Sequence, residues 1–234
     1  MAKCGLNISD ISRRRIGLFG GTFNPIHNGH LHVASTVLKK LSLTQVLFIP
    51  TGHPPHKDPT AILASEDRLQ MLALALSPHA SFAVCDEEVR RAGVSYTIDT
   101  LRILKKKYPD ARLFFIVGVD AFAQIETWKT PEQLVQVCDF AVISRPRFPF
   151  SKLPQFGPLE KLDRSCLDQL DEGTLQIYPF SLSDQTVCHF LNIPHSEVSA
   201  SEIRGRISAA KPLKNLLPHP VQSYIIKRNL YKRG

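Results

Sequence analysis

Two histidines and a pair of glycines stand close together near the start of the chain. Residues 20–30 (Gly-Gly-Thr-Phe-Asn-Pro-Ile-His-Asn-Gly-His) follow a short apolar run and precede an amphipathic segment, residues 31–41. This order predicts a strand, a glycine turn and a helix start, where main-chain N–H groups and the helix dipole favour an anion. His27 and His30 would lie on one face of that helix start and add imidazole donors. We therefore expect a nucleotide phosphate site here.

Residues 20–30 match neither of two common nucleotide-binding motifs. The G-x-G-x-x-G pattern of dinucleotide sites is absent, and no Gly-Lys-Ser/Thr follows as in a Walker A loop. Two histidines at this spacing also occur as zinc ligands or as core residues. A zinc site needs a further His, Cys or acidic ligand, and the neighbouring sequence offers none. Phosphate binding is the interpretation we favour, with no metal held by the protein itself.

A second segment near the C-terminus places hydroxyl and guanidinium groups at another helix start. Ser199, Ser201 and Arg204 lie in a turn that begins a helix running through Ala209. Such groups at a helix N-terminus can hold the outer phosphates of a triphosphate. Alone, the same residues make an ordinary N-cap followed by a surface arginine. Combined with residues 20–30, they supply the other end of a triphosphate site.

Apolar runs alternate with helical patterns along most of the chain. This alternation predicts an α/β fold, a doubly wound and mainly parallel sheet with helices on both faces. We expect strands at residues 16–19, 45–50, 81–85, 112–118, 140–144 and 187–191. We expect helices at residues 31–41, 68–76, 96–107, from 120, over about 159–170, at 199–209 and at 220–229.

The notable polar residues follow the ends of the predicted strands. They occupy residues 20–30, 51–57, 87–97 and 118–128. In parallel sheets ligands bind beyond the carboxyl ends of the strands, near the switch in strand order. These segments should therefore converge on one edge of the sheet.

Composition narrows the class of protein. With 43% hydrophobic and 21% charged residues, the 234-residue chain can bury a full core. A net charge of +8 attracts phosphates without choosing among nucleotides, nucleic acid and membrane surfaces. Five widely spaced cysteines, no apolar leader and no apolar run of about 20 residues indicate a cytoplasmic protein with reduced thiols. We expect one domain over residues 1–234, with an insertion near 148–186 and a C-terminal helical part at 199–234.

Three more stretches complete a family resemblance. They are Pro-Thr-Gly-His-Pro-Pro-His-Lys at 50–57, Ser-Tyr-Thr-Ile-Asp-Thr-Leu at 95–101, and Ile-Val-Gly-Val-Asp at 116–120 with Trp128. With the H-x-G-H at 27–30 and the turn at 198–204, the chain resembles the H-x-G-H nucleotidyltransferase superfamily. Within it, the chain is most similar to the bacterial nicotinate-nucleotide adenylyltransferase family, over residues 16–145 and 190–231.

The resemblance implies roles for individual residues. The catalytic group would be His27, His30 and Arg204. ATP would be bound by Gly20, Gly21, Thr22, Phe23, Gly29, Gly118, Asp120, Ser199, Ser201 and Ile203, with Ile203 near the adenine. The acceptor would be bound by Lys57, Tyr96, Thr97, Trp128 and Arg145, with Trp128 stacked on the pyridine ring.

Several of these residues have ordinary structural alternatives. Trp128 could be a core or rim residue, Asp120 a helix N-cap, Tyr96 a packing residue and Arg145 a surface loop residue. Residues 148–186 show no family landmark and could add a helix and strand or an oligomer contact. Ala200 stands where the family often has a second hydroxyl, which leaves one donor fewer.

The implied reaction is adenylyl transfer from ATP to nicotinate mononucleotide, giving nicotinate adenine dinucleotide and pyrophosphate. Mg²⁺ would ride on the ATP phosphates with mostly water ligands. An acceptor such as nicotinamide mononucleotide is the first alternative, and a basic nucleotide- or RNA-binding module is the alternative of a different class. We expect small-molecule substrates, and we expect neither a membrane nor nucleic acid as a partner. The sequence leaves open whether the protein forms a homo-oligomer.

Overall fold

The computed structural model describes residues 14–53, 62–153, 157–194 and 198–232. Within these ranges seven strands form a single sheet in the order β3-β2-β1-β4-β5-β7-β6. All neighbouring strands are parallel except β6 and β7, which are antiparallel. The strands are β1 Arg15–Gly21, β2 Gln45–Pro50, β3 Phe82–Val84, β4 Arg112–Gly118, β5 Asp139–Ile143, β6 Ile177–Ser181 and β7 Val187–Leu191.

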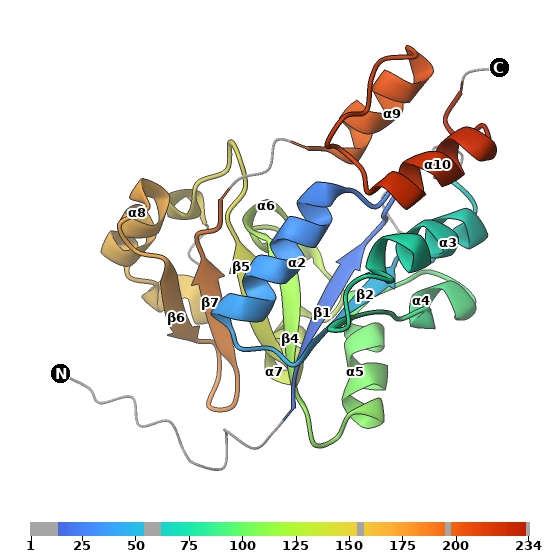
Figure 1. Cartoon of the computed structure of the whole chain (residues 1–234). Helices are drawn as coiled ribbons and strands as arrows, with labels where there is room; N and C mark the ends of the chain where they lie inside the picture. The colour runs from blue at the N-terminus through green and yellow to red at the C-terminus, as the bar shows by residue number, and fades with distance from the viewer. Residues whose placement is uncertain (1–13, 54–61, 154–156, 195–197, 233–234) are drawn as a thin grey trace.

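Helices cover both faces of this sheet. Figure 1 shows α2 crossing in front of the strands, with α9 and α10 at the upper right. The α-helices are α2 Asn28–Lys40, α3 Ser65–Leu76, α4 Glu87–Arg90, α5 Thr97–Lys107, α6 Val119–Phe122, α7 Pro131–Val137, α8 Arg164–Glu172, α9 Ala200–Ser208 and α10 His219–Lys227. Short 3-10 helices lie at η2 Ile125–Thr127, η3 Phe150–Lys152 and η4 Gly157–Lys161.

The sheet divides the core into two layers, because successive side chains of a strand point to opposite faces. Leu18 of β1 packs with the apolar sides of α5, α7 and α8. Phe19, the next residue, packs with α2, α3, α9 and α10. The central strands are buried on both faces, which explains their continuous apolar sequences.

The strand order reverses between β1 and β4. The chain runs from β1 outward to β2 and β3, then returns to β4 on the other side of β1. The crevice at such a switch point is where doubly wound sheets bind ligands. The turn after β1 and the turn after β4 therefore face each other across the place where a ligand is expected. The predicted fold class is confirmed.

Residues 148–186 differ from the expectation in detail. One helix was predicted over residues 159–170, but the chain forms η4 and then α8, which ends at Gly173 in the left-handed conformation (φ 79°). An added helix and strand was one of the alternatives for this stretch, and α8 and β6 have that form, although the bounds of the strand were not predicted. Strand β6 contains Pro179, and a proline within such a run argues against a strand except at a sheet edge.

Candidate active site

The two histidines cap helix α2 reciprocally. The Nδ1 atom of His27 accepts a hydrogen bond from the main-chain N–H of His30 at 3.3 Å. The Nδ1 atom of His30 accepts one from the main-chain N–H of His27, also at 3.3 Å. The two rings are stacked with their centroids 3.6 Å apart. This is the geometry of a capping box, built from imidazoles in place of hydroxyl and carboxylate groups.

These hydrogen bonds fix where each imidazole carries its hydrogen. Since Nδ1 accepts in both rings, a neutral ring must carry its hydrogen on Nε2. Burial, and next the charge of Arg145, lower the pKa of His27 to about 4. Burial, then His27 and Arg145, lower the pKa of His30 well below its usual value. Both rings are therefore neutral Nε2–H donors at physiological pH.

An aromatic floor supports the histidine pair. The ring of Phe23 meets the ring of His30 edge-on at 5.0 Å and packs against Phe19 and Phe48. The backbone of Phe23 is in the left-handed region (φ 47°), which turns this side chain back under the loop. A Cβ on Gly21 would come within 3.0 Å of the Phe23 ring, so the glycine allows this close packing. Phe23 is thus buried beneath the loop, where its side chain supports His30.

The turn at the start of α9 reaches the turn after β1. Arg204 donates from Nη1 to the main-chain oxygen of Asn24 at 2.9 Å and from Nη2 to the Ser201 hydroxyl at 3.2 Å. Ser199 is the N-cap of α9, and its hydroxyl accepts from the N–H of Glu202 at 3.1 Å. The structure therefore brings together the two segments from which a phosphate site was predicted.

Ile203 lies near the start of α9 and belongs to the core. This side chain is fully buried in the core layer that includes α2. Its main-chain N–H already donates to the Ser199 carbonyl at 3.1 Å. A branched apolar residue on the inner face of an amphipathic helix packs inward. The place of Ile203 near the adenine stays a prediction.

A pocket opens beside the histidine pair. Among the residues that line it are Phe19, His27, Gly29, His30, Arg145 and Val198. Nε of Arg145, one of these lining residues, lies 3.8 Å from the carboxylate of Asp120. A Cβ on Gly118 would meet this Asp120 oxygen at 2.4 Å and Arg145 Nε at 2.6 Å. Only glycine at position 118 lets this ion pair lie over the end of β4.

Three of the predicted acceptor residues lie at the start of α5 and the end of η2. Tyr96 is the N-cap residue of α5 and Thr97 its first residue. Lys129 places its Nζ 4.4 Å from the centre of the Tyr96 ring and 3.0 Å from Asp99. Trp128 is half-buried, with its ring edge-on to Phe115 at 6.2 Å. Both aromatic rings are held at the rim of the core with part of their surface exposed.

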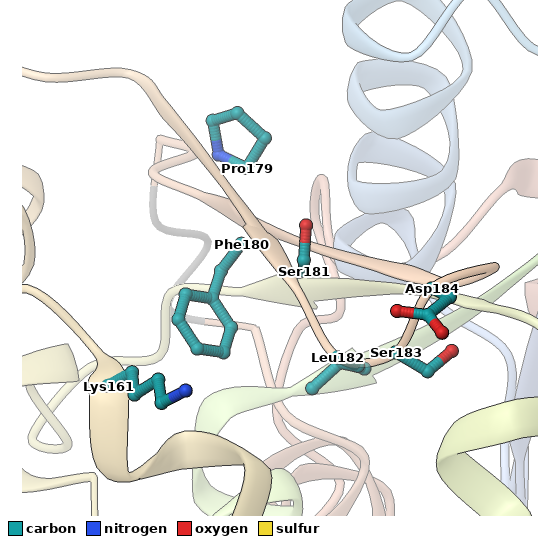
Figure 2. Close-up of a pocket in the computed structure, with 7 residues that line it drawn as sticks. All are labelled: Lys161, Pro179, Phe180, Ser181, Leu182, Ser183 and Asp184. Atoms are coloured by element: carbon teal, nitrogen blue, oxygen red, sulfur yellow. The ribbon is translucent and has the colours of Figure 1, made fainter. Parts of the chain in front are cut away.

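One predicted site residue lies outside the described ranges, and one hollow lies apart from this pocket. Lys57, together with His56, is outside the residues that the structure describes. A hollow beside β6 is lined by Lys161, Phe180 and Asp184, which Figure 2 shows with their neighbours. None of the predicted site residues lines it. The described ranges contain no group of three or more His, Cys, Asp and Glu side chains arranged to hold a metal ion.

Sequence reasoning missed several buried polar residues around the site. Tyr231 donates to the Asn24 side-chain oxygen at 2.9 Å, and burial raises the pKa of this tyrosine. Arg68 and Glu88 are buried charges behind the loops that follow β1 and β2. Arg68 could have been identified from the sequence as a charged residue within an apolar stripe. It stands one turn before Met71 and Leu72 on the buried side of α3.

Comparisons with known proteins agree with the geometry. Residues 18–206 match the cytidylyltransferase-like family. A probable nicotinate-nucleotide adenylyltransferase of Desulfitobacterium hafniense is 38% identical over 94% of this chain and 96% of its own length. Its counterpart in Moorella thermoacetica is 36% identical over 93% of this chain and 92% of its own length.

Solved structures share the fold. The nicotinic acid mononucleotide adenylyltransferase of Plasmodium falciparum, solved with NaAD, has a TM-score of 0.69 at 21% identity, over 93% of this chain and 97% of that one. In the described part of the chain, no helix is both long and apolar enough to cross a membrane. The family expected from the motifs is confirmed: the chain belongs to the cytidylyltransferase-like family and, within it, to the nicotinate-nucleotide adenylyltransferases.

Proposed function

We propose that the protein transfers the adenylyl group of ATP to nicotinate mononucleotide, releasing pyrophosphate and forming nicotinate adenine dinucleotide. The observation that carries the proposal is the hydrogen bond between Arg204 and the Asn24 carbonyl at 2.9 Å. It joins the late helix start to the turn that holds His27 and His30. Two anion-binding helix starts therefore face one crevice, at the switch point of the sheet.

The reaction needs positioned donors more than a base. The 5′-phosphate of the acceptor is already ionised near neutral pH and attacks the α-phosphorus of ATP directly. The bond from that phosphorus to the bridging oxygen breaks, and pyrophosphate leaves with the electron pair. Catalysis then depends on in-line alignment and on donors that meet the charge spread over the phosphoryl oxygens.

The neutral histidine pair suits this role. The Nε2–H groups of His27 and His30 would donate to the α-phosphate and to the neighbouring phosphates. A neutral imidazole with its hydrogen on Nε2 donates to a phosphate oxygen while its Nδ1 keeps the capping hydrogen bond. Arg204, with the hydroxyls of Ser199 and Ser201, would hold the departing pyrophosphate. Arg145 would close the pocket over the nucleotide.

The remaining predicted residues divide between the two substrates. The main chain at Gly20, Gly21 and Thr22 would follow the ATP phosphates, and Gly29, Gly118 and Asp120 would border the nucleoside. On the acceptor side, the N-terminus of α5 at Tyr96 and Thr97 would bind the nicotinate carboxylate, since helix N-termini favour anions. Trp128 would stack on the pyridine ring, and Lys57 would reach an acceptor phosphate.

Magnesium would enter with ATP. The polar side chains that line the pocket are two imidazoles, one guanidinium group and one hydroxyl, and the carboxylate of Asp120 lies 3.8 Å from the guanidinium of Arg145. Mg²⁺ prefers oxygen ligands and keeps several waters, so this donor set fits an ion held mainly by the phosphates. We also propose a cytoplasmic location, in keeping with four free cysteines among the described residues.

Pyrophosphate release tests the proposal directly. The purified protein is incubated with Mg²⁺, ATP and either nicotinate mononucleotide, nicotinamide mononucleotide or another phosphorylated acceptor. We expect the nicotinate compound to give the highest kcat/KM, with the dinucleotide identified by mass spectrometry. A higher kcat/KM for the amide would move the assignment to nicotinamide mononucleotide. Absence of product with every acceptor would reject adenylyl transfer.

A further inference from the structure

Arg68 is a buried cation behind the active-site loops. It lies in the second turn of α3 and is 2% exposed. Burial lowers the pKa of its guanidinium, while Tyr231 and Glu66 raise it. All its hydrogen bonds within the described ranges go to main-chain oxygens: Leu63 at 3.1 Å, Thr22 at 3.0 Å and Thr51 at 2.8 Å. A buried charge is costly unless it is hydrogen-bonded, and these three carbonyl oxygens stabilise the buried guanidinium.

Two of those carbonyls belong to different substrate loops. Thr22 follows β1, in the turn proposed to hold the ATP phosphates. Thr51 follows β2, at the start of the loop that leads toward the proposed acceptor site. Strands β1 and β2 pair along their length, and beyond their last paired residues the Thr51 N–H donates to the Gly21 oxygen at 2.9 Å. Beyond that bond, Nη1 of Arg68 bridges the diverging chains.

The loop after β2 is also held from its other side. The buried carboxylate of Glu88 accepts hydrogen bonds from the Gly52 N–H and the Thr100 hydroxyl. The hydroxyl of Ser95 accepts from the His53 N–H at 3.3 Å. A Cβ on Gly52 would lie 2.2 Å from the Glu88 main-chain oxygen, which shows how closely the segments pack. Residues 51–53 are therefore fixed between Arg68 and Glu88.

We propose that Arg68 is a positioning residue that sets the separation between the ATP loop and the acceptor loop. It touches neither substrate. By holding the Thr22 and Thr51 carbonyls on one nitrogen, it keeps the α-phosphorus of ATP within in-line reach of the acceptor phosphate. Each loop still binds its own ligand when this bridge is weakened, but the two reacting atoms are no longer aligned. The inference rests on the function proposed above.

The test compares Arg68→Lys with a control on the same helix. Lysine keeps the charge but lacks the planar fork, so it cannot hold all three carbonyls in the same geometry. The control is Asp67→Asn. Asp67 accepts from the Tyr224 hydroxyl at 2.7 Å and lies 3.6 Å from Arg228, so its change loosens α3 from α10 without touching either loop. Both variants are assayed at a temperature at which circular dichroism shows them folded, and Arg68→Gln is assayed in the same way.

The expected result is a split between turnover and binding. Misalignment by about 1 Å can cost about 100-fold in rate, so kcat of Arg68→Lys should fall about 10- to 100-fold below that of Asp67→Asn. The Kd of nicotinate mononucleotide, and that of a non-hydrolysable ATP analogue, each measured alone by calorimetry, should stay within about threefold of wild type. Arg68→Gln should be at least as slow as Arg68→Lys.

Two outcomes would overturn the inference. Equal kcat in Arg68→Lys and Asp67→Asn would show that Arg68 only stabilises α3. A loss of turnover matched by weaker binding of either ligand alone would show that it shapes one site and does not align two. Failure of the proposed function is a separate result, since wild-type protein would then form no dinucleotide from nicotinate mononucleotide.

Discussion

The buried histidine pair should make the stability of the protein fall on mild acidification. The pKa of His27 is about 4 in the folded protein, against 6.5 for an unperturbed histidine. Between these values the unfolded chain binds a proton that the folded protein does not bind. The contribution of neutral His27 to the free energy of unfolding is therefore present above pH 6.5 and is lost as the pH falls toward 4. At a pH of about 5.5, one such histidine lowers the free energy of unfolding by about 1.4 kcal/mol.

The variant His27→Asn isolates this contribution. Asparagine is a favoured N-cap residue, so its side chain can still accept from the main-chain N–H of His30, but it does not titrate. We expect wild type to lose about 1.4 kcal/mol more than His27→Asn between a pH of about 7.5 and a pH of about 5.5. Urea unfolding at both pH values gives the four free energies required.

A second histidine provides the control. His189 is also held neutral, since burial lowers its pKa to about 4, but it lies on β7 and outside the proposed site. His189→Gln should remove a similar part of the pH dependence while leaving kcat unchanged. His27→Asn should remove it and lower kcat as well. If wild type and His27→Asn lose the same free energy over this pH range, His27 titrates normally and the assignment of neutral donors is wrong.

Three further changes probe other parts of the site. His30→Ala should lower kcat about 100- to 1,000-fold with folding retained, the usual cost of losing one transition-state donor; near-normal turnover would remove His30 from the mechanism. Trp128→Ala should raise the KM of nicotinate mononucleotide about tenfold and leave that of ATP nearly unchanged, because it removes a stacking surface on the acceptor side only. Tyr231→Phe should lower the free energy of unfolding by about 1 kcal/mol, since it removes the hydrogen bond to Asn24; an unchanged urea midpoint would contradict this contact.

The sheet could be predicted because its central strands are buried on both faces. Residues 45–50 and 112–118 were expected as strands and form β2 and β4 with those limits. In an α/β protein, a continuous apolar run of this length is typical of a central parallel strand. Strand β6 lies at the edge of the sheet, where one face is exposed and Pro179 is tolerated, so its sequence carries no comparable pattern.

The convergence of the site was predictable for a related reason. Parallel strands bring all the loops at their carboxyl ends to one side, so motifs at strand ends had to meet. The hydrogen bonds that fix those loops were not predictable, because they join residues far apart in the chain. Arg204 meets Asn24 across 180 positions, and Arg68 meets Thr22 across 46. No local spacing encodes such pairs.

The spacing of the two histidines acquires a physical explanation from the structure. A capping box requires its partners at the N-cap and three residues later, which are the positions of His27 and His30. Reciprocal capping occupies both Nδ1 atoms, so both Nε2–H groups remain available as donors. Burial, together with the positive charge of Arg145, lowers the pKa of both rings and keeps them neutral. The spacing thus makes a rigid pair of neutral donors that both present Nε2–H, and an imidazole pair free to rotate would lack this fixed orientation.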